Sequence, residues 1–323
     1  MTEQPLLLAV PSKGRLQENT SSFFARSGLA FIQSRGVRDY RATIPGIPHV
    51  EVLFLSASEI ASQLASGTVH LGITGEDLIR EQIPQADDVI EFLTPLGFGH
   101  ANVVVAVPQA WIDARTMSDL SEIATDMHTR HGRKLRVATK YIHLTRRFFA
   151  EKGVLDYIIV ESLGATEGAP ATGTADVVVD ITSSGATLAA NALKIIDDGV
   201  ILRSEANLAA SLQANWTTHA REAVKQVLTR IAAENAARNI REIHVALDGQ
   251  SVSALEKVLE DFSLSVPYIL DRHVAVVHCP VSQVFDFVNA LQALDMPSIS
   301  VRKLDYLFLP ENPLMQKLMK RIT

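Results

Sequence analysis

A short run of hydroxyl residues carries the clearest chemical potential in this sequence. Asp180 stands two positions before it, and the run consists of Thr182, Ser183, Ser184, Gly185, Ala186 and Thr187. Hydroxyl groups donate hydrogen bonds to phosphate oxygens, and a carboxylate accepts them from sugar hydroxyls or helps to hold a metal. A phosphorylated sugar needs both kinds of group side by side. We therefore expect an anion site here, and a helix N-cap with a turn is the alternative explanation of the same residues.

The elements around this run would present it to a ligand. Apolar residues predict a buried strand over 176–181, and a helical pattern follows from Leu188 to Leu193. The first N–H groups of a helix lack internal partners, and Gly185 permits close backbone approach or a positive φ. No Gly-Lys-Ser/Thr follows, which excludes a Walker A loop. The sequence also has no Gly-x-Gly-x-x-Gly to support a dinucleotide-binding fold.

This segment resembles the phosphoribosyl-pyrophosphate loop of the ATP phosphoribosyltransferase family, whose members catalyse the first step of histidine biosynthesis. The matching pattern is Ala175-Asp176, an apolar run, Asp180, two further residues, and then Ser183-Ser184-Gly185-Ala186-Thr187-Leu188. Four other stretches match in the family's order, and they are Ala9–Leu16, Leu71–Leu78, Leu96–Pro108 and Val137–Phe148. The five motifs together span most of the chain before residue 205.

The resemblance implies an activity and a set of site residues. The activity is transfer of the phosphoribosyl group of phosphoribosyl pyrophosphate to N1 of ATP, with release of pyrophosphate and with Mg²⁺ as cofactor. Residues 182–187 would bind the 5-phosphate, with Arg147 and Glu167 as further substrate-binding residues. Catalytic roles are implied for Asp180, Lys13 and Arg15. The metal ligands are left unassigned.

Some of these assignments have a simpler alternative. Lys13 and Arg15 follow a buried strand, Leu6 to Val10, at the edge where open α/β sheets bind ligands, but loop cations usually face water. Glu167 is equally well explained as a loop carboxylate. Three arginines, Arg35, Arg38 and Arg41, could line a nucleotide pocket or be solvated.

Composition excludes several classes of protein. The chain has 323 residues, of which 47% are hydrophobic and 20% charged, and its formal net charge is −6. No basic block suggests nucleic-acid binding. A single cysteine, Cys279, excludes an internal disulfide framework and is expected to be a small buried side chain. The first apolar run is too short for a signal peptide or a membrane span, so we expect no membrane association and a cytoplasmic location.

Alternating strands and helices before residue 205 predict a parallel or mixed sheet. The resemblance implies an α/β catalytic core with two lobes, similar to type II periplasmic binding proteins. We assign residues 1–95 and 190–220 to lobe I and residues 96–189, which include the hydroxyl loop, to lobe II. A strand over 199–205 is expected to return the chain to lobe I.

Residues 221–323 form a third segment. An Ala-rich helix over 221–239 is expected to carry little core, and a β-α-β-β-α-β pattern follows it. That order predicts a ferredoxin-like α+β domain. The resemblance implies that it is a regulatory or oligomerisation domain, that histidine binds it as an inhibitor, and that the protein is a homo-oligomer, from dimer to hexamer. The alternative function for the whole chain is a non-catalytic binding or sensor module for a phosphorylated small molecule.

Overall fold

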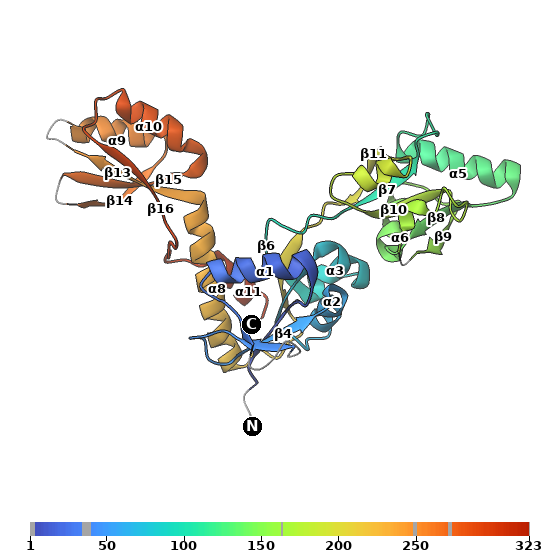
Figure 1. Cartoon of the computed structure of the whole chain (residues 1–323), viewed down its shortest axis with the longest axis horizontal. Helices are drawn as coiled ribbons and strands as arrows, with labels where there is room; N and C mark the ends of the chain where they lie inside the picture. The colour runs from blue at the N-terminus through green and yellow to red at the C-terminus, as the bar shows by residue number, and fades with distance from the viewer. Residues whose placement is uncertain (1–3, 34–39, 163, 248–250, 271–272, 323) are drawn as a thin grey trace. The chain divides into compact units, whose positions relative to one another are not determined.

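The computed structural model describes residues 4–33, 40–162, 164–247, 251–270 and 273–322. It divides into two compact units (Figure 1). Unit 1 comprises the described residues of Met1–Phe23, Phe31–Ala223 and Lys317–Thr323, and unit 2 those of Phe24–Ala30 and Val224–Gln316. Unit 1 contains two sheets and unit 2 a third.

The first lobe of unit 1 is built on a seven-stranded sheet with the order β2-β3-β4-β1-β5-β12-β6. Its core strands β1, β4 and β5 are parallel, whereas β12 runs antiparallel to both β5 and β6. The strands are β1 Leu6–Pro11, β2 Ile32–Gln33, β3 Arg41–Thr43, β4 Val50–Leu55, β5 Leu71–Gly75, β6 Ile90–Pro95 and β12 Ala206–Ser211. The helices are α1 Gly14–Arg26, α2 Ala57–Ala65, α3 Glu76–Gln82 and α4 Ala86–Val89.

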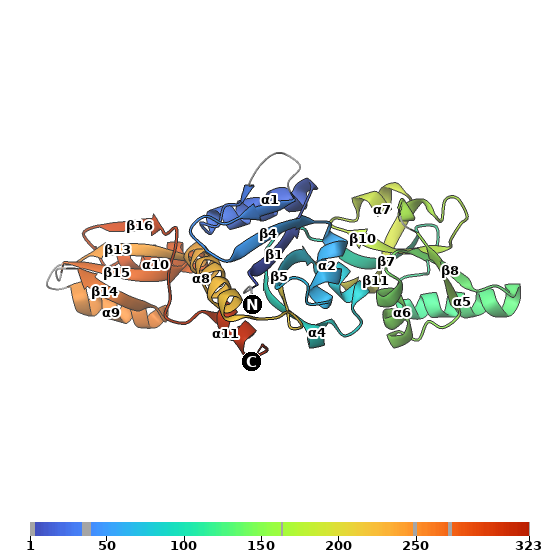
Figure 2. The same cartoon turned by 90° about the horizontal axis from the view of Figure 1, so that it is seen from below.

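Packing of α2 against β1 and β5 illustrates how this lobe forms its core (Figure 2). Ser56 begins the helix, since its Oγ accepts the Glu59 N–H at 3.2 Å. The helix then buries Ile60 and Leu64, one turn apart, against Ala9 and Val69. A helix with one apolar face therefore covers central strands that are largely apolar, as in other α/β folds.

The second lobe has a five-stranded sheet with the order β11-β7-β10-β8-β9. Strands β8, β9 and β10 are parallel, and β7 is antiparallel to β10 and β11. The elements are β7 Asn102–Pro108, α5 Met117–His131, β8 Leu135–Thr139, α6 Ile142–Glu151, β9 Tyr157–Glu161, β10 Val177–Thr182, α7 Ala186–Ala190 and β11 Leu193–Leu202. The chain enters this lobe after β6 and leaves it before β12. Two lobes joined by two crossings confirm the predicted architecture, that of type II periplasmic binding proteins.

The return to the first lobe lies later than expected. Leu193 was predicted to end a helix, but it begins β11, which pairs with β7 and so belongs to the second lobe. The short helix α7 ends at Ala190 because Ala192 adopts a left-handed conformation with φ 55°. The strand that returns to the first sheet is β12, rather than 199–205. Residues 193–202, which we had placed in lobe I, therefore lie in the second lobe.

Unit 2 confirms the ferredoxin-like prediction. Its sheet has the order β14-β15-β13-β16 with every pair antiparallel, and α9 and α10 cover one face (Figure 1). The buried thiol of Cys279 belongs to that core. The elements are β13 Ile240–Ala246, α9 Ser251–Asp261, β14 Ser265–Leu270, β15 Val274–Pro280, α10 Val284–Gln292 and β16 Ile299–Lys303.

The helix before this domain differs from its prediction. Helix α8 spans Thr218–Asn239 and begins within unit 1. We expected it to carry little core, but many of its side chains are buried, among them Val224, Val227, Leu228 and Ile231. These four follow the helical spacing i, i+3, i+4, i+7, so the alanines around them had hidden a regular apolar stripe. In the described part of the chain, no helix has both the length and the apolar character to cross a membrane.

The end of the chain returns to unit 1. Lys317 in helix α11, Pro313–Met319, and Arg321 after it pair with the buried carboxylate of Glu91 on β6, at 3.2 and 3.0 Å. Arg221 also donates to the carbonyl oxygen of Ile322 at 2.7 Å. The segment 221–323 is therefore not one domain throughout, because its last residues pack with the first lobe.

Candidate active site

The hydroxyl loop connects β10 to α7 in the second lobe. Gly185 occupies the N-cap position of α7 with φ 77°, and its N–H donates to Thr182 Oγ1 at 2.7 Å. The N–H of Ala186 donates to Ser184 Oγ at 3.4 Å. Two hydroxyl oxygens thus shape the loop, while each hydroxyl keeps its own hydrogen to donate. The capping alternative and the binding hypothesis are therefore compatible in the same residues.

The loop is open to solvent where a ligand would approach. Ser183, Ser184 and Thr187 are exposed, and Thr182 is half-buried. Leu188 on α7 is buried against the sheet and fixes the helix that follows. The nearest heavy atom to a side-chain carbon added at Gly185 would be Cδ1 of Ile195, at 3.7 Å. Gly185 is therefore needed for its backbone conformation and not because neighbours crowd it.

Asp180 is a half-buried carboxylate directly before the loop. Its Oδ1 accepts the Ile181 N–H at 2.8 Å. Burial raises the pKa of Asp180 most strongly, the Ile181 hydrogen bond and Lys140 oppose that rise, and the Glu167 carboxylate adds to it. Lys140 and Glu167 therefore both act electrostatically on Asp180. The structure brings the predicted Glu167 together with Asp180, since its 3₁₀ turn, Thr166–Gly168, packs against β10.

Lys140 is a site residue that the sequence analysis missed. It follows β8 directly, and the parallel register pairs Thr139 with Val179, which brings Lys140 level with Asp180 at the same edge of the sheet. The stretch 137–141 had been noted only as part of a family pattern. The relevant signal is the pairing of β8 with β10, two strands about 40 residues apart, which the chain order does not reveal.

The other predicted cations come from different elements. Lys13 lies between β1 and α1 in the first lobe, and Arg15 lies in the first turn of α1. Arg147 is exposed on α6 in the second lobe. Among the described residues, none of these three forms a hydrogen bond or ion pair with Asp180. They remain available for a polyanionic ligand.

Of the three arginines considered for a nucleotide pocket, the structure describes Arg41. Arg35 and Arg38 lie outside the described residues. Arg41 is on β3 and forms an ion pair with Glu51 on the neighbouring strand β4. Arg41 therefore has a partner within the sheet.

Comparison with known proteins identifies the family. The model of the family described as ATP phosphoribosyltransferase matches residues 56–233. An ATP phosphoribosyltransferase of Nitrobacter winogradskyi is 54% identical over 315 residues, which is 97% of either chain. This chain belongs to the ATP phosphoribosyltransferase family. The resemblance inferred from five motifs is therefore confirmed, and the protein is an enzyme of the transferase class.

Further relatives extend the match along the chain. An ATP phosphoribosyltransferase of Afipia carboxidovorans is 52% identical over 316 residues and again covers 97% of both chains. A solved ATP phosphoribosyl transferase (HisG:HisZ) complex from Thermotoga maritima contains a chain with 22% identity and a TM-score of 0.54. The match covers 70% of this chain and 95% of that one, and it supports the fold of the two lobes.

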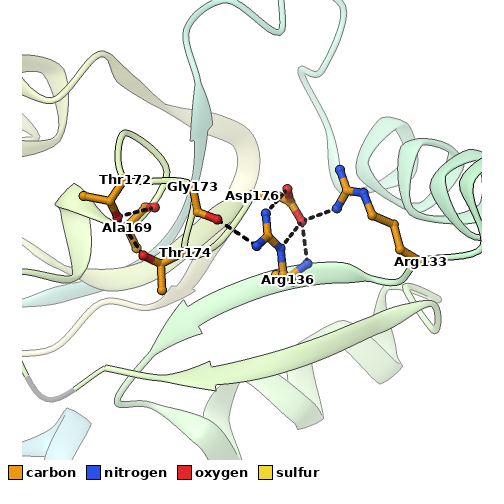
Figure 3. Close-up of polar contacts among 7 residues, drawn as sticks. All are labelled: Arg133, Arg136, Ala169, Thr172, Gly173, Thr174 and Asp176. Atoms are coloured by element: carbon orange, nitrogen blue, oxygen red, sulfur yellow. Dashed lines mark hydrogen bonds and ion pairs between the residues drawn. The ribbon is translucent and has the colours of Figure 1, made fainter.

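A second polar cluster anchors the other end of β10 in this family member (Figure 3). Asp176 accepts from Arg136 Nε and Nη2 at 3.2 and 3.0 Å, from the Arg136 backbone N–H at 2.9 Å, and from Arg133 at 2.9 Å. Arg136 also donates to the Gly173 carbonyl at 2.7 Å. Burial alone would raise the pKa of Asp176, but these hydrogen bonds outweigh it and lower the pKa. The cluster ties the turn at Gly173 to β8 and to the start of β10.

Proposed function

We propose that this enzyme joins the phosphoribosyl group of phosphoribosyl pyrophosphate to N1 of ATP, releasing pyrophosphate, as the first step of L-histidine biosynthesis in the cytoplasm. The observation that carries the proposal is Asp180, half-buried beside an open hydroxyl–glycine loop with Lys140 and Glu167 next to it. Family membership supports the same reaction.

The loop donors and the Asp180 carboxylate would have different roles because they carry different charge. The loop donates hydrogen bonds to the 5-phosphate, and each charge-assisted bond contributes roughly 1.5–3 kcal/mol. Asp180 accepts from ribose hydroxyls and stabilises the positive charge that develops on the ribose as pyrophosphate departs. Burial raises the free energy of ionised Asp180 in the free protein. A cation-like ribose would stabilise that carboxylate in the transition state and offset part of this penalty.

Cations would neutralise the two polyanions. Lys13, Arg15 and Arg147 are exposed and suited to the pyrophosphate and the ATP phosphates, and Lys140 is suited to the anion nearest Asp180. Holding two negatively charged substrates together in one geometry would lower the activation free energy of the transfer. These roles rest on position and charge.

The acidic pair fits Mg²⁺ as the metal. Glu167 raises the pKa of Asp180, so the two carboxylates repel each other, and a divalent cation between them and the substrate would relieve that repulsion. In the described part of the chain no group of three or more His, Cys, Asp or Glu side chains could hold a metal by itself. That donor set suits Mg²⁺, which commonly takes one or two carboxylates and completes its shell with substrate oxygens and water. Bound Mg²⁺ would neutralise charge on the leaving pyrophosphate.

Histidine regulation and self-association belong to the same proposal. Unit 2 contains none of the phosphate-site residues, so the chemistry does not require it. We propose that histidine, the end product of the pathway, binds unit 2 and inhibits by favouring one arrangement of a homo-oligomer over another. Histidine must then bind that arrangement better, and tenfold discrimination corresponds to about 1.4 kcal/mol.

A direct assay tests the reaction. Full-length protein mixed with ATP, phosphoribosyl pyrophosphate and Mg²⁺ should give phosphoribosyl-ATP, followed by its ultraviolet absorbance. Omitting Mg²⁺ should abolish turnover, and millimolar histidine should reduce it. Binding of phosphoribosyl pyrophosphate without any product would favour the non-catalytic binding module instead. Histidine that gives neither inhibition nor heat of binding would leave unit 2 with a structural role.

A further inference from the structure

A buried carboxylate joins the two lobes of unit 1. Asp77, in the first turn of α3, is 5% exposed. Its Oδ2 accepts the phenolic O–H of Tyr141 at 2.8 Å, and its Oδ1 accepts the hydroxyl of Ser204 at 2.8 Å. Tyr141 belongs to the second lobe, whereas Ser204 lies between β11 and β12, where the chain returns to the first. The three side chains therefore connect both lobes at a crossing point.

The backbone leaves room for this carboxylate. A side-chain carbon at Gly75 would collide with Asp77 Oδ1, so the carboxylate occupies space that only glycine provides. The N–H of Asp77 also donates to Ser204 Oγ at 2.9 Å. Burial raises the pKa of Tyr141 well above its usual value, and Asp77 adds to that rise, so the phenol stays protonated and donates at any physiological pH.

One helical turn further along α3, Glu81 makes a second link between the lobes. Its two carboxylate oxygens accept the backbone N–H groups of His143 and Leu144 at 2.9 and 3.0 Å. These are N–H groups of the first turn of α6, which lack partners within that helix. The N-cap residue of α6, Tyr141, supplies no side-chain cap. A carboxylate of the first lobe therefore caps a helix of the second.

The Asp77 and Glu81 links both connect α3 to the segment that follows Lys140 of the candidate site. Asp77 and Glu81 are four residues apart and share one face of α3. Lys140 immediately precedes Tyr141, and its Nζ lies 5.0 Å from the centre of the Tyr141 ring. Asp180 also acts electrostatically on Tyr141. The tyrosine thus contacts the lysine of the second-lobe site with its ring and the first lobe with its hydroxyl.

We propose that Tyr141, Asp77 and Glu81 are positioning residues that hold the second-lobe site, Lys140 and Asp180, in register with the first-lobe cations Lys13 and Arg15. The inference rests on the proposed transferase reaction, whose two substrates must meet across the lobes. The Asp77 carboxylate accepts from two hydroxyl groups, and burying a carboxylate costs solvation free energy. We therefore assign it a positioning role and not a stabilising one. The 5-phosphate end of the substrate is bound by the second-lobe loop alone, so affinity for ribose 5-phosphate, which lacks the pyrophosphate, does not depend on this register.

The test compares Tyr141→Phe with wild type in the full-length protein. The variant keeps the ring under Lys140 and removes only the hydroxyl. We expect kcat to fall about tenfold, equal to about 1.4 kcal/mol, while calorimetric affinity for ribose 5-phosphate, which the second-lobe loop would bind alone, changes less than about twofold. Tyr157→Phe is the matched control, since Tyr157 is a half-buried tyrosine on β9 of the same lobe, and it should leave kcat unchanged.

A second variant gives a readout without catalysis. Glu81→Gln should speed hydrogen exchange at the His143 and Leu144 amides, because a neutral amide oxygen caps less strongly than a carboxylate. Tyr157→Phe should not. Wild-type kcat in Tyr141→Phe, or unchanged exchange in Glu81→Gln, would overturn the proposal. Absence of product from the wild-type protein would instead refute the transferase reaction and leave the exchange result to decide whether the link exists.

Discussion

Gly185 offers the sharpest test of the phosphate loop. Its φ of 77° lies in the left-handed region, where an L-residue costs roughly 1–2 kcal/mol and a β-branched residue more. A Gly185→Val protein can avoid that cost by rotating to a negative φ. Such a rotation would turn the N–H of residue 185 away from Thr182 Oγ1, which it now meets at 2.7 Å.

The consequences for folding and binding differ in size. For the fold, the change costs about 2 kcal/mol, because the new side chain meets no neighbour closer than Ile195 at 3.7 Å. For binding, reorienting the loop would displace the Thr182 and Ser184 hydroxyls, whose oxygens now accept the N–H groups of residues 185 and 186. The loss of two charge-assisted bonds to the phosphate costs roughly 1.5–3 kcal/mol each. Affinity for phosphoribosyl pyrophosphate should therefore fall by a factor of about 10² to 10⁴.

Calorimetry with Mg²⁺ and phosphoribosyl pyrophosphate measures the loss of affinity, and thermal unfolding measures the loss of stability. Gly153→Val is a matched control, since Gly153 has φ 74°, lies in the same lobe and has no heavy atom within 4 Å of an added side-chain carbon. It should lose similar stability and keep full affinity. The reasoning fails if Gly185→Val binds like the wild type, or if both variants lose affinity equally.

Three further predictions follow from charged groups. Asp180→Asn should lower kcat at least tenfold and raise the unfolding temperature at pH 7. Because the pKa of Asp180 is raised in the folded protein, the ionised carboxylate makes the fold less stable as pH rises through that pKa, and a neutral amide has no such dependence. His70, whose Nδ1 accepts the Leu7 N–H, has a pKa lowered by burial, so wild-type stability should fall as pH drops below 6.5, whereas His70→Gln should lack this dependence in urea melts. Glu91→Gln should cost about 1–2 kcal/mol in urea unfolding, since Lys317 and Arg321 lose their buried partner, while the exposed Glu222→Gln should stay within about 0.5 kcal/mol.

Local patterns were sufficient for most of the fold and for the loop. The hydroxyl run, the strand before it and the β-α-β-β-α-β order of unit 2 depend on neighbours in the chain, and each appeared as predicted. Composition misled for the core of α8, and local propensity misled at the end of α7. The alanines around 190 favour a helix, but the left-handed Ala192 ends it and lets Leu193 begin a strand.

The remainder of the site depends on contacts between distant residues. Lys140 became a candidate only when β8 was seen to pair with β10. Tyr141 and Asp77 are 64 residues apart, and Glu81 reaches helix α6 from the other lobe. No periodicity in the sequence reports such pairings, because they depend on the order of strands in a sheet and on how helices meet.

The return of the chain's end to unit 1 changes how unit 2 should be regarded. Unit 2 is bracketed by the first lobe on both sides in the chain, so it is an insertion in topology and not an appendage. A stop codon placed before it would also strip Glu91 of both cations and leave a buried anion in the lobe that should be tested alone. A minimal catalytic protein therefore calls for an internal excision that rejoins α8 to the tail through a linker. In the intact enzyme, any change within Val224–Gln316 reaches unit 1 through the covalent connections at both ends of that segment, and Phe24–Ala30 adds two more connections between the units.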